Sequence, residues 1–132
     1  DTTLAPVQMF ANADLLLQQN KFGEALTLLD SLSGRFPFHS ITDEVLYKRG
    51  EIYEELQQWD DSIGTYSIIV ESYAHDILAD DAAFRMAKVY QHRLEDKEKA
   101  AEYYKKILYE FPSSLFVAES RKNYREIKAT FL

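Results

Sequence analysis

Carboxylates are the most numerous groups in this sequence that could do chemistry, and two pairs of them are adjacent: Glu54-Glu55 and Asp60-Asp61. Two carboxylates that share a proton can act as general acid and general base. Neighbouring residues on a helix point in different directions, however, so neither pair forms such a dyad. The sequence also lacks a glycine-rich phosphate loop, a Gly-x-Ser-x-Gly turn and a His-Glu-x-x-His motif. We therefore predict no catalytic residues and a protein that is not an enzyme.

Histidine and acidic side chains bind metal ions where they cluster. His39, His75 and His92 do not pair at a spacing of three or four residues. The run HDILADD, from His75 to Asp81, contains residue types that bind zinc, but we interpret it as a junction at which Asp residues cap helices. The sequence contains no Cys, which excludes disulfides, thiolate zinc sites and Cys nucleophiles. We predict neither a metal nor a cofactor.

The charge of the chain narrows the class of partner. With 22 Asp and Glu against 15 Lys and Arg, the formal net charge is −7. This argues against nucleic acid, because a duplex-binding face needs clustered Lys and Arg and a single-strand stacking platform needs a basic groove. A basic protein segment is a more natural partner. The local run SRKNYREIK, from Ser120 to Lys128, could meet an acidic partner or lipid headgroups, or form a solvated terminal helix.

Apolar residues recur at helical spacing along almost the whole chain, which has only 4 Gly and 3 Pro to separate short strands. No apolar run approaches the roughly 18 residues of a membrane span. Pro37 and Pro112 end the helices that precede them. Ser40, Asp60, Asp96 and Ser113 are candidate N-caps. The pattern predicts an all-α fold with helices at 4–19, 22–35, 40–57, 60–73, 77–94, 97–110 and 114–131.

The predicted helices repeat in pairs. Ala13, Gly50 and Ala87 are 37 residues apart, and the later landmarks of the third pair are shifted by one residue within QHRLED. Small residues at these positions let the neighbouring helix approach closely, which offsets the cost of about 1 kcal/mol for Gly50 inside a helix. A period of this length, made of two helices, is typical of an α-solenoid.

In these positions the chain resembles the tetratricopeptide repeat family. The family's small, aromatic, small, aromatic and proline positions are, in the third pair, Ala87, Tyr90, Ala100, Tyr104 and Pro112. The matching positions are Ala13, Leu16, Ala25, Leu29 and Pro37 in the first pair and Gly50, Tyr53, Ser62, Tyr66 and Ala74 in the second. The usual tryptophan position differs and holds Met9, Leu46 and Ala83. The resemblance implies a right-handed superhelical stack of repeats at about 4–37, 40–74 and 77–112.

The repeats run 37 to 38 residues instead of the family's 34, and their junctions look like those of bacterial envelope members of the family, such as outer-membrane assembly lipoproteins and Tol-Pal-associated factors. The last predicted helix, 114–131, has Arg125 where Gly50 and Ala87 stood. We interpret it as a polar capping helix. Because the chain starts at Asp1 without a leader, we expect a fragment of a longer or processed protein, with a single domain over residues 1–132.

The resemblance implies that the first helix of each pair lines a concave face that binds a partner segment. Apolar and aromatic anchors would lie within an acidic rim, as in a groove for a basic segment. The candidate binding residues are Phe10, Asp14, Leu17, Glu44, Tyr47, Glu51, Glu54, Glu55, Asp81, Phe84, Lys88 and Gln91, and the same face includes Val7, Gln18 and His92. The alternative is that the aromatics pack between helices and the acids only solvate a face.

Two functions of different classes remain open at the level of the sequence. The first is a non-enzymatic protein-interaction scaffold. The second is architectural: the chain would be the C-terminal end of a longer repeat array, with Val7, Met9 and Phe10 packed on upstream repeats or on a second copy in a homo-oligomer.

Overall fold

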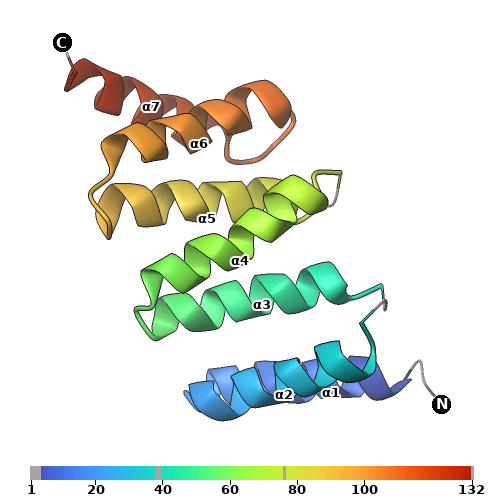
Figure 1. Ribbon diagram of the computed structural model, residues 1–132. Coiled ribbons are helices and arrows are strands. Elements are labelled where there is room, and N and C mark those ends of the chain that lie inside the picture. The colour runs from blue at the N-terminus through green and yellow to red at the C-terminus, as the bar shows by residue number, and fades with distance from the viewer. Residues whose placement is uncertain (1–3, 38–39, 76, 132) are drawn as a thin grey trace. The chain divides into compact units, whose positions relative to one another are not determined.

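The helical pairs expected from the periodicity are present in the computed structural model, which describes residues 4–37, 40–75 and 77–131. Seven α-helices and no strand lie in these residues (Figure 1). The helices are α1 Leu4–Gln18, α2 Phe22–Arg35, α3 Thr42–Glu55, α4 Trp59–Ser72, α5 Ala79–His92, α6 Lys97–Glu110 and α7 Val117–Ala129. The all-α prediction is confirmed, and the predicted bounds differ by at most three residues.

The starts of α3, α4, α5 and α7 differ from the prediction, and three of the four predicted N-caps are wrong. Only Asp96 caps as expected: its carboxylate accepts the backbone N–H of Lys99 at 3.0 Å. Ser40 precedes the true cap of α3, Ile41, and Asp60 lies inside the first turn of α4. Ser113 precedes a turn in which the hydroxyl of Ser114 accepts the N–H of Phe116 at 3.0 Å, so α7 begins only at Val117.

The turns inside the pairs show where the third repeat accommodates its extra residue. Asn20 and Gln57 have φ of 60° and 59°, and each ends its helix with two hydrogen bonds of the Schellman type. In the second pair Gln58 donates to the carbonyl of Tyr53 at 2.9 Å and Gln57 to that of Glu54 at 3.0 Å. Glu95, with φ of 52°, holds the same place in the third pair, but there Asp96 donates to Tyr90, six residues back. The extra residue predicted within QHRLED is therefore accommodated in this turn.

The chain divides into two compact units, unit 1 (residues 1–65) and unit 2 (residues 66–132), with the division inside α4. In unit 1, α1 and α2 lie side by side, and α3 packs on both (Figure 1). The unit 1 core consists of Ala13, Ala25, Leu29, Leu32, Val45 and Ile52, all buried. Gly50 is buried as well. The small residues at 13, 25 and 50 thus lie inside the packing, as the repeat pattern predicts.

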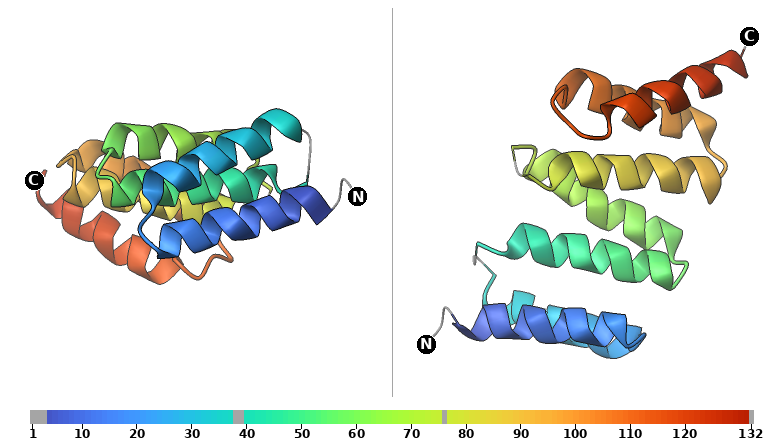
Figure 2. Two further views of the ribbon diagram at one scale, coloured as in Figure 1. Left: turned by 90° about the horizontal axis from the view of Figure 1, so that it is seen from below. Right: turned by 180° about the vertical axis from the view of Figure 1, so that it is seen from behind.

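Unit 2 repeats the same packing with larger side chains. α6 packs on α5, and α7 packs on α6 (Figure 2). Ala83, Ala87 and Ala100 are fully buried. Tyr66 and Tyr104 occupy equivalent repeat positions and are also fully buried. Arg125 on α7 is exposed.

Candidate functional site

Three side chains from two helices of unit 1 meet around one lysine. Lys48 on α3 donates to Asp14 on α1 at 2.7 Å and lies 3.3 Å from Glu51, one turn further along its own helix. Its ammonium is also 5.9 Å from the centre of the Phe10 ring on α1. Only 15% of the Lys48 side chain is exposed. The structure therefore brings together three of the predicted binding residues, Phe10, Asp14 and Glu51, around a cation that was not predicted.

The electrostatics of this Lys48 cluster keep the lysine charged. Burial by itself lowers the pKa of Lys48, but the hydrogen bond to Asp14 and the charge of Glu51 outweigh it. The pKa of Lys48 is therefore raised above its ordinary value of 10.5. At neutral pH the ammonium offsets part of the negative charge of Asp14 and Glu51.

The other predicted residues of unit 1 lie around this cluster. Phe10 and Leu17 are partly buried and pack against the unit 1 core. Tyr47 and Glu54 are half-buried, whereas Glu44 and Glu55 are exposed. Glu44, Glu51 and Glu55 are seven and four residues apart, a spacing that places them on one face of α3. We call these three residues the acidic stripe.

A second ion pair fastens α3 to α2. Arg49 forms an ion pair with Asp30 of α2 and donates to the Tyr53 hydroxyl at 3.1 Å. Burial lowers the pKa of Arg49, but its interactions with Asp30 and Tyr53 outweigh this, so that the pKa is raised. Lys48 and Arg49 were not among the residues predicted from the sequence. The available signal was two adjacent cations within a helix that is otherwise acidic.

In unit 2 the predicted residues take part mainly in packing. Phe84 is buried: its ring stacks on Phe116 with centroids 4.4 Å apart and meets the edge of Tyr104 at 6.1 Å. The Gln91 side chain accepts the Tyr104 hydroxyl at 2.6 Å. Phe84 therefore packs between helices, as the alternative to a binding role predicted. Sequence reasoning did not identify Phe116 as its partner.

Lys88 remains on the surface of unit 2. Its ammonium lies 3.2 Å from Glu119 of α7 and 5.6 Å from the centre of the Phe84 ring. About two fifths of the side chain is exposed (42%). Asp81 is half-buried at the start of α5. Lys88 and Glu119 thus link α5 to α7 by an accessible ion pair, which contributes little stability.

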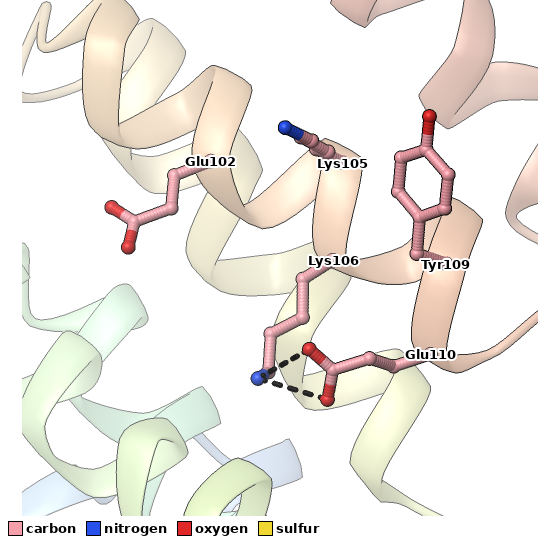
Figure 3. Close-up of a pocket in the computed structure, with 5 residues that line it drawn as sticks. All are labelled: Glu102, Lys105, Lys106, Tyr109 and Glu110. Carbon is pink, nitrogen blue, oxygen red and sulfur yellow. Dashed lines mark hydrogen bonds and ion pairs between the residues drawn. The ribbon is translucent and has the colours of Figure 1, made fainter.

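A shallow hollow of about 360 Å³ lies on α6 (Figure 3). It is lined by Glu102, Lys105, Lys106, Tyr109 and Glu110, and Figure 3 shows the ion pair between Lys106 and Glu110, at 3.0 Å. Tyr109 is 75% exposed. All five residues come from one helix, and no nucleophile with an adjacent base lies among them. The hollow therefore lacks the convergent groups of a catalytic site.

The described residues contain neither a cluster of metal ligands nor a helix suited to cross a membrane. No group of three or more His, Cys, Asp or Glu side chains there could hold a metal ion. His75 and His92 are exposed, whereas His39 and Asp76 lie outside the described residues. Within the same ranges, none of the helices has both the length and the apolar character needed to cross a bilayer.

Comparison with known proteins identifies the repeats. A family model described as Tetratricopeptide repeat matches residues 10–77, and a second model with the same description matches residues 81–114. The two matches include α2, α3, α4 and α6 completely, α1 from residue 10 onward and α5 from residue 81 onward. The search of curated proteins gave no match. Because one model alone matches more than half of the 132 residues, the chain belongs to the tetratricopeptide repeat family.

Proposed function

We propose that this protein is a non-enzymatic interaction scaffold whose first-helix surface binds a partner segment rich in basic side chains. Tetratricopeptide repeats generally mediate protein–protein interaction. The observation that carries the specific proposal is the Lys48 cluster, in which Asp14, Glu51 and the Phe10 ring hold an ammonium group. The same surface would receive a partner's lysine or arginine in the same way.

The acidic stripe and the neighbouring aromatic residues supply the recognition in this proposal. Glu44 and Glu55 are exposed and form no ion pair within the described residues. An exposed charge pair contributes about 0.2–1 kcal/mol, so several pairs and apolar contacts are needed together. Half-buried Tyr47 and Phe10 would supply the apolar contacts. Binding of this kind is fast and sensitive to salt.

In the third repeat the proposal rests on Asp81, Lys88 and Gln91. Asp81 and Lys88 retain accessible surface, and Gln91 is half-buried. Phe84, at 9% exposure, would contribute by supporting α5 from within. We therefore expect α1 and α3 to carry most of the binding energy.

A fluorescent helical peptide with lysines at positions i, i+4 and i+7 tests the proposal by anisotropy. The variant Glu44→Lys/Glu55→Lys should weaken its binding at least tenfold. The variant Glu24→Lys/Asp60→Lys changes the net charge equally, at exposed positions outside α1 and α3, and should bind as the wild type does. Equal loss in both variants would show a general charge effect and overturn the proposed surface. Circular dichroism controls for folding.

The architectural function is the second candidate, and one residue favours it. Leu15 is 54% exposed, although its equivalents Ile52 and Val89 are buried. Against it, Gln8 and Asn12 hydrogen-bond to each other at 3.0 Å on the exposed surface of α1. If α1 packs on further repeats or on a second copy, Leu15→Glu lowers the melting temperature of the full-length protein. An unchanged melting temperature would remove this candidate.

We extend the proposal to a partner in the bacterial cell envelope. The support is the resemblance of the long repeats and their junctions to envelope members of the family. Fractionation of cells that produce the full-length protein tests it, and recovery in the cytoplasm alone would overturn this part.

A further inference from the structure

The last helix exposes a face that its counterpart in the third repeat buries. Arg121, Arg125 and Lys128 on α7 occupy the repeat positions of Ala83, Ala87 and Tyr90 on α5. The two alanines are fully buried, and Tyr90 stacks on Tyr103 of α6 with centroids 5.7 Å apart. On α7 all three positions are exposed. We call Arg121, Arg125 and Lys128 the basic stripe.

The basic stripe is a single face with uncompensated charge. Its members are four and three residues apart, a spacing that places them on one side of the helix. None of the three has an ion pair among the described residues, and Lys122 beside them is exposed too. Glu119, one of the two acids on α7, lies against Lys88 instead. Mixed charges are enough to keep a helix face solvated, whereas the basic stripe carries cations alone.

The complementary charge lies in the other unit of the same chain. Residues 1–65 contain 11 Asp and Glu against 4 Lys and Arg, whereas residues 66–132 contain 11 of each kind, so the first unit accounts for the net charge of −7. Within unit 1 the acidic stripe offers two exposed carboxylates, Glu44 and Glu55. Glu51 and Glu55 are four residues apart, as are Arg121 and Arg125, which gives a rise of about 6 Å on each helix.

We propose that the basic stripe of one molecule docks on the acidic stripe of a second copy. The inference rests on the proposed function, because it names the basic segment that the α3 surface binds. The two surfaces differ, so the contact is heterologous, and two molecules joined by one contact together keep one free surface of each kind. The association is therefore head-to-tail, grows with protein concentration and weakens as salt screens the charges.

Sedimentation velocity over a concentration series tests this association. The sedimentation coefficient of the wild type should rise with concentration at about 0.01 M ionic strength and rise much less at about 0.5 M. Arg121→Glu/Arg125→Glu should remain monomeric, and so should Glu44→Lys/Glu55→Lys. The matched control Lys97→Glu/Lys99→Glu, at exposed positions in the first turn of α6, should associate as the wild type does. Circular dichroism confirms that each variant is folded.

Mixing two variants that each neutralise one stripe gives the decisive result. Arg121→Gln/Arg125→Gln retains only the acidic stripe, and Glu44→Gln/Glu55→Gln retains only the basic one. Their equimolar mixture should form a 1:1 complex that does not grow further, because each component has a single usable surface. A mixture that remains monomeric, or a wild type that is monomeric at every concentration, overturns the proposal. Retention of a monomeric wild type by a polyglutamate peptide would assign the basic stripe to another acidic protein instead.

The lysine peptide separates this inference from the proposed function. If the wild type does not associate but binds the peptide, and Glu44→Lys/Glu55→Lys does not bind it, only the second copy is the wrong partner. If neither association nor peptide binding occurs, the α3 surface itself is wrongly assigned.

Discussion

At the scale of single residues, Lys48 decides the character of the unit 1 surface. Its ammonium lies between two carboxylates from different helices and close to an aromatic ring. Because only 15% of the Lys48 side chain is exposed, water screens its charge less than at the surface, and the two carboxylates interact with it more strongly than in an exposed pair. The same cluster thus holds α1 to α3 and demonstrates how this surface accommodates a cation.

Replacing Lys48 by Met tests the structural part of that role. The substitution leaves the half-buried Asp14 and Glu51 close together without their cation, and we expect the free energy of unfolding to fall by about 1–2 kcal/mol. Lys99→Met removes a pair in which the lysine is 53% exposed, and should change stability by less than about 0.5 kcal/mol. Urea denaturation measures both. Equal effects would show that the Lys48 pair behaves as an ordinary surface pair.

Tyr104 makes the free energy of unfolding depend on pH in the alkaline range. Burial raises the pKa of Tyr104 to about 12, with a smaller contribution from the charge of Glu119. The unfolded chain loses this proton near pH 10, before the folded protein does, so unfolding becomes easier as pH rises from about 10 to 12. The raised pKa of Tyr104 contributes up to about 2 kcal/mol to the free energy of unfolding. This contribution is complete below about pH 10 and is lost as the pH rises toward about 12.

Urea midpoints measured between about pH 9 and pH 11.5 check this linkage. Tyr104→Phe has no phenol to titrate and should show a shallower decline over that range than the wild type. An identical decline in the two proteins would mean that other groups cause it.

At the scale of elements, the helical pairs depend on one left-handed residue each. Asn20 tolerates positive φ better than other non-glycine residues, but Gln57, at φ of 59°, does not. The two hydrogen bonds that close the turn after α3 hold it there. In each repeat the steric cost of positive φ at this residue is therefore opposed by the hydrogen bonds that close the turn.

Gln57→Gly should raise the free energy of unfolding by about 0.5–1 kcal/mol, because glycine adopts this backbone conformation without steric cost. Ala11→Gly, at an exposed position inside α1, should lower it by about 1 kcal/mol. Thermal or urea unfolding of both variants provides the comparison. Destabilisation by Gln57→Gly would indicate that the unfolded chain's added freedom outweighs the relieved strain.

At the scale of the whole molecule, the two compact units differ in their net charge and in the size of their buried side chains. The charge excess lies in the first unit, and the large buried tyrosines lie in the second. In repeat proteins each repeat is stabilised mainly by its own packing and by its contacts with the adjacent repeats. Damage to one core should therefore remain largely in the unit where it occurs.

Leu29→Ala tests this expectation in the unit 1 core, where Leu29 is fully buried. Such a truncation costs about 2–5 kcal/mol. Hydrogen exchange should speed up in α1 and α2 while the amides of α6 remain protected. Uniform loss of protection in all helices would show that the chain unfolds as one cooperative unit.

The sequence by itself determined the helices, their pairing and the repeat length, because these follow from local properties. Periodic apolar residues, the small residues at 13, 50 and 87 and the polar turns all act within a few residues of their place in the chain. Even so, the starts of α3 and α7 were wrong, since the loop before each helix competes with its first turn. The binding residues were named by analogy with the family.

Only the tertiary structure decided what those residues do. Asp14 contacts Lys48, which lies 34 positions later in the chain, and the Phe84 ring stacks on Phe116, which directly precedes α7. No local pattern specifies these contacts. The same holds for the basic stripe, whose meaning depends on the absence of a helix packed on it among the described residues. Packing between helices depends on side chains distant in sequence, and it determines which charges are paired and which remain exposed for a partner.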